Sequence, residues 1–233
     1  MSAEVTESKN YHHGELKAAL LEAAWEVIDA GGLDKLTMRE LSRRVGVSHA
    51  APYHHFKNRD ALLDALRQEA FAGFTEALAD SGKRARSPDK RLFEMGRAYI
   101  DFARRYPARM GLMFTLRPCE AEVSETERRS FEVLVDAIVA LQKAGMAPKG
   151  DPSRLALLAF SAVHGFAKLW AEGPISAMPP YEATYEKSRD QMLRTLIRGF
   201  MSERVLADRE RSETRTRAGK PSATKPRGSG RKR

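Results

Sequence analysis

The stretch Leu36 to Leu62, LTMRELSRRVGVSHAAPYHHFKNRDAL, predicts two short helices joined by a tight turn and followed by a third helix. Thr37 and Glu40 have the spacing of a capping box, in which each side chain satisfies a free amide of the first helical turn. Leu36 and Leu41 occupy the two positions of a hydrophobic staple. We therefore expect a helix to start at Thr37.

The second half of the stretch predicts the turn and a second helix. Gly46 can adopt the backbone geometry that ends a helix and redirects the chain. Ser48 is a favourable N-cap for a helix over His49 to about His55, although Pro52 should tighten or distort its first turn. Two helices joined by a short turn that contains glycine are typical of a helix-turn-helix, a DNA-reading unit.

This arrangement resembles the helix-turn-helix of the TetR/AcrR family of transcriptional regulators. The residues that carry the resemblance are Thr37, Leu41-Ser42, Gly46-Val47-Ser48, Tyr53-His54-His55-Phe56, Arg59 and Leu62. Their order and spacing together are specific, whereas each part alone is weak. The resemblance is close over about the first third of the chain. For the rest it implies a helical domain that binds a ligand and dimerises.

The expected fold class is all-α, with an N-terminal three-helix helix-turn-helix DNA-binding domain and a larger helical ligand-binding and dimerisation domain. We expect residues 1–13 to be a flexible arm, with a contact to the DNA backbone or minor groove as a further hypothesis. The first long helix should span Glu15 to Ala30 and pack against the two helices of the helix-turn-helix. The DNA-binding domain is predicted over 14–57, the helical domain over 58–206 and a disordered basic tail over 207–233.

Candidate DNA contacts follow from residue type and from the matching family positions. Small residues such as Ala50 suit thymine methyl groups, and Ser48, His49 and His54 are the best polar readers of base edges. Tyr53, His55, Lys57 and Arg59 are expected at phosphates, although Tyr53 and Phe56 could instead be core residues, an alternative we favour for Phe56. The full predicted DNA-binding set is Thr37, Arg39, Arg44, Ser48, His49, Ala50, Tyr53, His54, His55, Lys57 and Arg59.

The charge distribution fits a nucleic-acid partner. Of the net charge of +9, the residues from Ala207 onward carry +7, from ten Lys or Arg against three Asp or Glu. The segment Thr37 to Arg59 has five Lys or Arg against Glu40, a local +4. Neutralising phosphates releases counterions and supplies much of the affinity for DNA. The tail loosely resembles an AT-hook but is interrupted at Ser229, so we interpret it as a nonspecific electrostatic element.

The expected body consists of helices with large, soft and aromatic side chains. Asn58 should cap a long linking helix that ends near Ala79, and later helices are expected over Pro88 to Tyr106, from Pro107, over Glu125 to Ala144, over Ser153 to Glu172 and over Tyr181 to about Val205. The resemblance implies a small-molecule effector, hydrophobic or aromatic, although each apolar residue singly is more often ordinary core. The candidate pocket residues are Phe71, Phe74, Phe93, Tyr99, Phe102, Met110, Met113, Phe114, Phe160, His164 and Trp170.

Two further features follow from the resemblance. Val163-His164-Gly165 is similar to the Trp-His-Gly motif of one subgroup, with Val163 in place of Trp, and His164 is interpreted either as a ligand contact or as a satisfied buried histidine. The last two helices are expected to pair with a second copy in a four-helix bundle, giving a homodimer on a double-stranded, palindromic DNA operator. The candidate interface residues are Leu158, Phe166, Leu169, Met192, Leu196 and Phe200.

Other classes of protein fit the sequence less well. Ser161, His164 and Asp190 could form a triad on paper, but Ser161 and His164 lie in one apolar helix, so we predict no enzyme activity. No metal-ligand spacing or cofactor motif appears, and neither a membrane span nor a secretion signal does, so we expect a cytoplasmic protein without cofactor. The alternative to a ligand-responsive repressor is a low-specificity, nucleoid-type DNA-binding protein that uses the basic tail.

Overall fold

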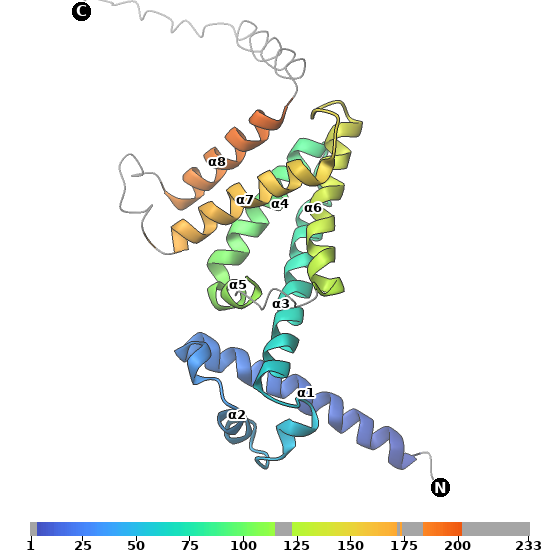
Figure 1. Ribbon diagram of the computed structural model, residues 1–233, viewed down its shortest axis with the longest axis vertical. Helices are drawn as coiled ribbons and strands as arrows, with labels where there is room; N and C mark the ends of the chain where they lie inside the picture. Colours follow the sequence, from blue (N-terminus) through green and yellow to red (C-terminus); the bar gives the residue numbers. More distant parts are fainter. Residues whose placement is uncertain (1–3, 115–122, 172, 174–183, 202–233) are drawn as a thin grey trace, which may run out of the picture.

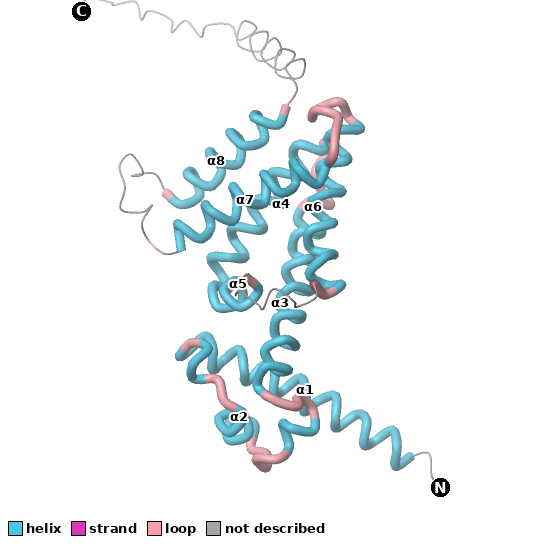
Figure 2. Tube along the Cα trace, viewed as in Figure 1, coloured by secondary structure: helices cyan, strands magenta, loops and turns pink. Residues whose placement is uncertain are grey.

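The computed structural model describes residues 4–114, 123–171, 173 and 184–201, and every regular element in these ranges is helical (Figures 1 and 2). The molecule has two lobes. The head comprises α1 (Glu4–Gly31), the 3-10 turn η1 (Leu33–Lys35), α2 (Met38–Val45), the 3-10 turn η2 (Ala51–His54) and the first turns of α3. The body comprises the rest of α3 (Arg59–Ser81) with α4 to α8. The predicted all-α class is confirmed.

Helix α2 begins as predicted, at the Thr37 cap, but the capping box is only half formed. The Thr37 hydroxyl oxygen accepts a hydrogen bond from the Glu40 amide at 3.1 Å. The Glu40 carboxylate does not return to the cap, because it accepts hydrogen bonds from Arg43 and Arg44 instead. Leu36 and Leu41 are fully buried, as the predicted staple requires.

Gly46 ends α2 in the left-handed conformation, with φ 74° and ψ 32°. The Val47 amide then donates to the Ser42 carbonyl at 3.0 Å, which closes the end of the helix. The turn predicted from Gly46 is therefore present. It directs the chain into the segment from Ser48 to Lys57, named the reading turn.

The reading turn is not the α-helix that was predicted over His49 to about His55. Regular structure is limited to one 3-10 turn, Ala51–His54, and Ala50 rather than Ser48 stands at its N-cap. Pro52 has no amide hydrogen and disfavours helical geometry at Ala51, so the α-helix predicted from His49 cannot continue regularly through this position. The Ser48 backbone carbonyl accepts from the Ala51 amide at 3.0 Å, and the predicted cap by the Ser48 side chain is wrong.

Helix α1 begins earlier than the sequence pattern indicated. The helix was expected from Glu15, but the backbone is helical from Glu4 to Gly31, so the predicted start of the helix is wrong. The flexible arm predicted over residues 1–13 stays a prediction. The first turns of α1 project beyond the head (Figure 1). Leu20, Ala24 and Ile28 on its later turns are buried in the head's core.

Helix α3 connects the lobes and is buried in both. Asn58 caps it as predicted, its side-chain oxygen accepting from the Ala61 amide at 2.9 Å. One continuous apolar side runs along the helix and packs against α1 below and against α4, α5 and α6 above. The buried residues on this side are Leu62, Leu66, Ala70, Phe71, Phe74 and Leu78.

The body helices have nearly the predicted bounds, because proline and serine mark their starts. They are α4 (Pro88–Arg105), α5 (Pro107–Met113), α6 (Glu125–Lys143), α7 (Pro152–Ala171) and α8 (Tyr185–Phe200). The predicted helix over Tyr181 to Val205 extends at both ends outside the described residues, and the predicted basic tail from Ala207 lies wholly outside them. Among the helices described, none is long and apolar enough to cross a membrane.

Gly46 and Gly73 have opposite backbone requirements. Replacing each with alanine tests the left-handed turn after α2 and the regular helix of α3. Gly46→Ala should lower the free energy of unfolding by about 1 kcal/mol, because alanine is strained at positive φ. Gly73→Ala should raise it by up to about 1 kcal/mol, because Gly73 is exposed within α3 and an added Cβ meets nothing there. Urea unfolding followed by circular dichroism measures both; stabilisation by Gly46→Ala would contradict the left-handed turn.

Candidate DNA-binding surface and ligand cavity

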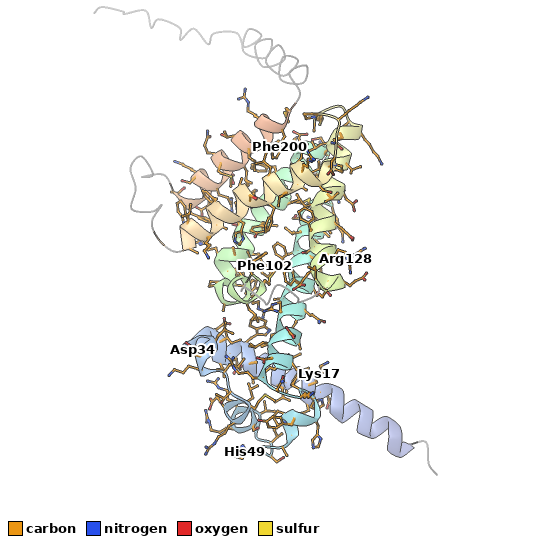
Figure 3. The ribbon with its side chains drawn as sticks, in the orientation of Figure 1. Lys17, Asp34, His49, Phe102, Arg128 and Phe200 are labelled. Atoms are coloured by element: carbon orange, nitrogen blue, oxygen red, sulfur yellow. The ribbon has the colours of Figure 1, made fainter. Side chains whose placement is uncertain are left out.

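The reading turn lies at the end of the head that is farthest from the body, where Figure 3 labels His49. Ser48, His49 and Ala50 are exposed there. Tyr53 is 55% exposed, so it is available to a partner and is not a core residue. His54 and Lys57 are exposed as well, and the turn therefore presents polar and small apolar groups on one convex end.

The residues behind the turn fix its position. Phe56 is buried, which confirms its interpretation as core, and its amide donates to the Pro52 carbonyl at 2.9 Å. His55 is only partly exposed. Arg59, predicted at a phosphate, donates from Nε to the Leu36 carbonyl at 2.9 Å and from Nη2 to the Leu33 carbonyl at 2.7 Å. Its position therefore assigns Arg59 a bracing role between α3 and the segment before α2.

The arginines of α2 are partly neutralised by carboxylates. Glu40 accepts from Arg43 at 2.9 and 2.7 Å and from Arg44 at 3.0 Å, and Arg44 also reaches Glu26 at 3.3 Å. These hydrogen bonds from Arg43 and Arg44 hold the pKa of Glu40 at about 2. The cluster of Glu26, Glu40, Arg43 and Arg44 has no net charge, whereas Thr37 and Arg39 beside it are exposed.

A cavity of about 200 Å³ lies in the body between α3, α4, α6, α7 and α8. Five of the predicted pocket residues line it: Phe71, Phe74, Tyr99, Phe114 and Phe160. Their rings meet mostly edge to face, with Phe74 and Tyr99 centroids 5.1 Å apart and Phe71 and Phe114 centroids 5.9 Å apart. The aromatic side of the predicted pocket is thus brought together by the fold.

The other predicted pocket residues do not line the cavity. Phe102 packs behind it against Phe74, at 5.2 Å between centroids, and Trp170 stacks on Phe166 at 5.7 Å. Phe93 lies under Arg194, whose guanidinium carbon is 5.1 Å from the ring centroid. Met110, Met113 and His164 also lie outside the lining, the two methionines being buried in α5.

The sequence interpretation missed most of the lining, which comes from helices that we assigned to core or dimer contacts. The lining residues outside the candidate set are Leu78, Leu92, Met95, Gly96, Glu127, Ser130, Phe131, Leu134, Ala159, Val163, Leu193, Leu196 and Ile197. A signal existed in the inward apolar stripes of α6 and α8, but a stripe does not show whether it meets packed atoms or a void.

His164 is held by Tyr99 next to the cavity. The Tyr99 hydroxyl and His164 Nδ1 are 2.8 Å apart, and the imidazole stacks on Phe160 at 5.5 Å between centroids. Burial and the charge of Lys168 lower the pKa of His164, while burial raises the pKa of Tyr99. The geometry fits a satisfied histidine rather than a nucleophile's base. The Asp190 carboxylate forms an ion pair with Arg189 at 2.9 Å. The hydrogen bonds of Asp190 and His164 therefore do not support a catalytic triad with Ser161.

Of the residues predicted at the dimer interface, only two residues of α7 are exposed. Leu158 and Leu169 are 54% and 46% exposed, and Leu157, which we did not predict, is 56% exposed. Phe166 and Phe200 are buried within the chain, so they were wrongly assigned to a surface. They pack inward because α7 and α8 must also cover the body's own core. Met192 and Leu196 are partly buried, and Leu196 lines the cavity.

Helix α5 touches the cavity region, the linking helix and the head. Phe114, directly after α5, lines the cavity. Arg67 of α3 is buried and donates to the Leu112 carbonyl at 3.1 Å. The Arg109 guanidinium carbon lies 4.7 Å from the Trp25 ring centroid of α1, and Trp25 Nε1 donates to Glu69 of α3 at 3.1 Å. Contacts therefore run without a gap from the cavity wall to α1.

Comparison with known proteins identifies both lobes. Residues 20–66 match the family model described as bacterial regulatory proteins, tetR family, and residues 92–196 match the one described as tetracyclin repressor-like, C-terminal domain. The chain belongs to the TetR family. The family's members named below are transcriptional regulators and not enzymes, which confirms the prediction of a regulator. The Trp-His-Gly subgroup stays a prediction.

Relatives of this TetR-family chain are similar mainly in the head. The class A tetracycline repressor from Escherichia coli transposon 1721 is 43% identical over 53 residues, which are 23% of this chain and 24% of that repressor. The match thus spans about a quarter of the length of such repressors. An HTH-type transcriptional regulator of Mycobacterium tuberculosis is 27% identical over 158 residues, 67% of this chain and 71% of that protein.

Solved structures extend the similarity to both lobes. A protein of unknown function from Rhodococcus sp. RHA1 is 35% identical and has a TM-score of 0.71, covering 82% of this chain and 98% of its own. A TetR-family transcriptional regulator from Pectobacterium atrosepticum has a TM-score of 0.61 at 23% identity, covering 83% of this chain and 97% of its own. The latter likeness shows the fold alone.

The Tyr99–His164 pair predicts how stability depends on pH. The folded pKa of His164 lies below its ordinary value of 6.5, so the unfolded chain takes up a proton first as pH falls. The contribution is present above pH 6.5 and is lost below it. Between about pH 7.5 and about pH 5, thermal unfolding should therefore show a larger loss of stability for the native chain than for His164→Gln. Identical pH profiles would contradict the burial of the neutral imidazole.

Proposed function

We propose that this TetR-family regulator binds a palindromic DNA operator as a homodimer and is released from it by a small hydrophobic or aromatic effector. The observation that carries the proposal is the exposed reading turn at the tip of the head, fixed between the Gly46 turn and the Asn58 cap. A separate apolar cavity in the body provides room for a ligand. Repression, rather than activation, is the expected direction because related proteins are named repressors.

The head has groups for both kinds of DNA contact. The exposed residues Ser48, His49 and His54 are proposed to hydrogen-bond base edges, and the exposed Ala50 methyl suits thymine. Thr37, Arg39, Tyr53 and Lys57, with Arg44 and His55 at the margin, are proposed at phosphates, which fix register without reading sequence. Arg59 contributes indirectly by bracing the segment before α2.

Dimerisation is supported by the exposed leucines of α7. Leu157, Leu158 and Leu169 form an apolar surface on a helix whose opposite side is buried in the body. Pairing of two such faces would remove this surface from water and set the distance between the two heads. A twofold dimer then requires two half-sites at a fixed spacing.

The proposed release couples the cavity to the heads through α5 and α3. A ligand that displaces Phe114 would act on α5, which holds Arg67 of α3 and contacts Trp25 of α1. A changed tilt of α3 would move the heads out of register with successive major grooves. Tenfold weaker operator binding needs only about 1.4 kcal/mol of differential affinity between the two states.

The deciding experiment is selection of bound sequences from random duplex DNA at physiological salt, using the full chain and a chain that ends at Leu206. An inverted repeat recovered by both chains is the expected result. Recovery of only AT-rich or random DNA would favour the low-specificity alternative. In either case, the shorter chain should show a weaker salt dependence if residues 207–233, which carry +7, act as an electrostatic tail.

The neutral cluster on α2 gives a prediction for DNA affinity. Glu40→Gln should free Arg43 and Arg44 for phosphates and raise affinity roughly three- to tenfold, with a steeper loss of affinity on adding salt. The Thr37 cap should persist, because it uses the Glu40 backbone amide. Fluorescence anisotropy with the selected operator measures the change. Glu22→Gln, an exposed carboxylate on α1, is the matched control, and an equal gain there would mean that only net charge matters.

A further inference from the structure

The polar groups that line the cavity are already satisfied by the protein. Three lining residues have polar side chains, Tyr99, Glu127 and Ser130. The Tyr99 hydroxyl is paired with His164 Nδ1 at 2.8 Å, and the Ser130 hydroxyl donates to the Glu127 carbonyl at 2.7 Å. An acceptor group of a ligand would therefore have to compete with the Glu127 carbonyl for the Ser130 proton and with His164 for the Tyr99 hydroxyl.

Charged ligands meet a further obstacle. Lys, Arg and His are absent from the lining as described, so an anion would find no counter-charge. The Glu127 carboxylate accepts from the Ser124 amide at 2.8 Å, while the Glu127 amide donates to the Ser124 hydroxyl at 3.3 Å. This complete capping box begins α6, so a cation would have to share the Glu127 carboxylate with the helix cap.

The dimensions of the cavity limit the ligand to about one ring. Its volume is about 200 Å³. An apolar cavity of roughly 150 Å³ accommodates benzene, so this one has space for a single ring with a short alkyl substituent. Two fused rings with substituents would require the walls to move.

The cavity lining is aromatic on one side and less aromatic elsewhere. Phe71, Phe74, Tyr99, Phe114 and Phe160 form one side, with neighbouring centroids between 5.1 and 6.1 Å apart. The remaining lining includes Phe131 and Leu134 of α6 and the aliphatic residues Leu193, Leu196 and Ile197 of α8. An aromatic guest can extend the edge-to-face packing on the first side and place an alkyl group against these aliphatic residues.

We propose that the effector is an uncharged, monocyclic aromatic molecule with a short alkyl substituent, bound in this cavity. The ligand class follows from the cavity alone, whereas its effect on DNA rests on the function proposed above. Phe114 connects the two, because it is both a wall of the cavity and the residue that follows α5.

The test measures direct binding of four probes to the full chain by calorimetry and thermal shift. Ethylbenzene should bind and raise the melting temperature. Benzoate and phenethylamine, which add one negative or one positive charge, should bind at least about tenfold more weakly. Naphthalene should also bind more weakly than ethylbenzene, because it needs more space.

Two matched variants test the location. Phe160→Ala enlarges the cavity and should improve binding of naphthalene relative to ethylbenzene, whereas Phe102→Ala removes a ring that packs behind the wall and should not. The probe series on the native chain stands even if a variant fails to fold. Equal or tighter binding of either charged probe, or no binding of ethylbenzene, overturns the proposal.

The role of Glu127 in ligand binding and the effect of the ligand on operator binding are measured in separate experiments. If phenethylamine bound the native chain at least as tightly as ethylbenzene and lost that affinity in Glu127→Gln, the site would take cations and the proposal would be wrong. Operator release is then measured by anisotropy with ethylbenzene. Ligand binding without release would leave the ligand class intact and contradict the effector mechanism, whereas absence of operator binding would contradict the proposed DNA function alone.

Discussion

Burial of one side of α3 in both lobes is the constraint on which the structure depends. Leu62 and Leu66 pack in the head, while Phe71, Phe74 and Leu78 pack in the body, and a helix transmits a rigid displacement along its axis. The lobes therefore cannot change their relation without disturbing apolar contacts at one end of α3 or the other. The wall of the cavity includes the same helix, so a ligand and the head act on a common element.

Charge counted along the chain is a poor guide to charge available at a surface. The segment around α2 has a local excess of positive residues, yet Glu26 and Glu40 hold Arg43 and Arg44 in a cluster without net charge. Arg59 is also engaged, by two backbone carbonyls. Fewer cations are thus left without a protein partner than the composition indicates, so the charge that a DNA-facing surface offers depends on how the helices pack as well as on their composition.

Features fixed by near neighbours in the chain could be predicted from the sequence. The Thr37 and Asn58 caps, the Gly46 turn and the start of α5 at Pro107 each depend on a few adjacent residues. The reading turn is an instructive failure: the effect of Pro52 was anticipated, but its extent was not, because the missing amide and the restricted preceding residue together leave only one 3-10 turn.

The cavity was predictable only in part, since it depends on how five helices meet. Phe102 and Phe74 have the same chemistry, but only Phe74 faces the void, and the distinction comes from the rotation of α3 and α4 about their axes. The helical period shows which side of a helix is apolar. It does not show whether that side meets another side chain, an empty space or a second copy, as the opposite fates of Leu169 and Phe166 on α7 demonstrate.

The brevity of the reading turn has a consequence for the information that the head can extract from DNA. One 3-10 turn with small residues at Ala50 and Ala51 can distinguish only a few base pairs, and short sequences recur by chance throughout a genome. On the proposed mechanism, selectivity must then come from requiring two such matches at one separation. The distance between the two heads then carries much of the sequence selectivity, and a small change in that distance abolishes specific binding.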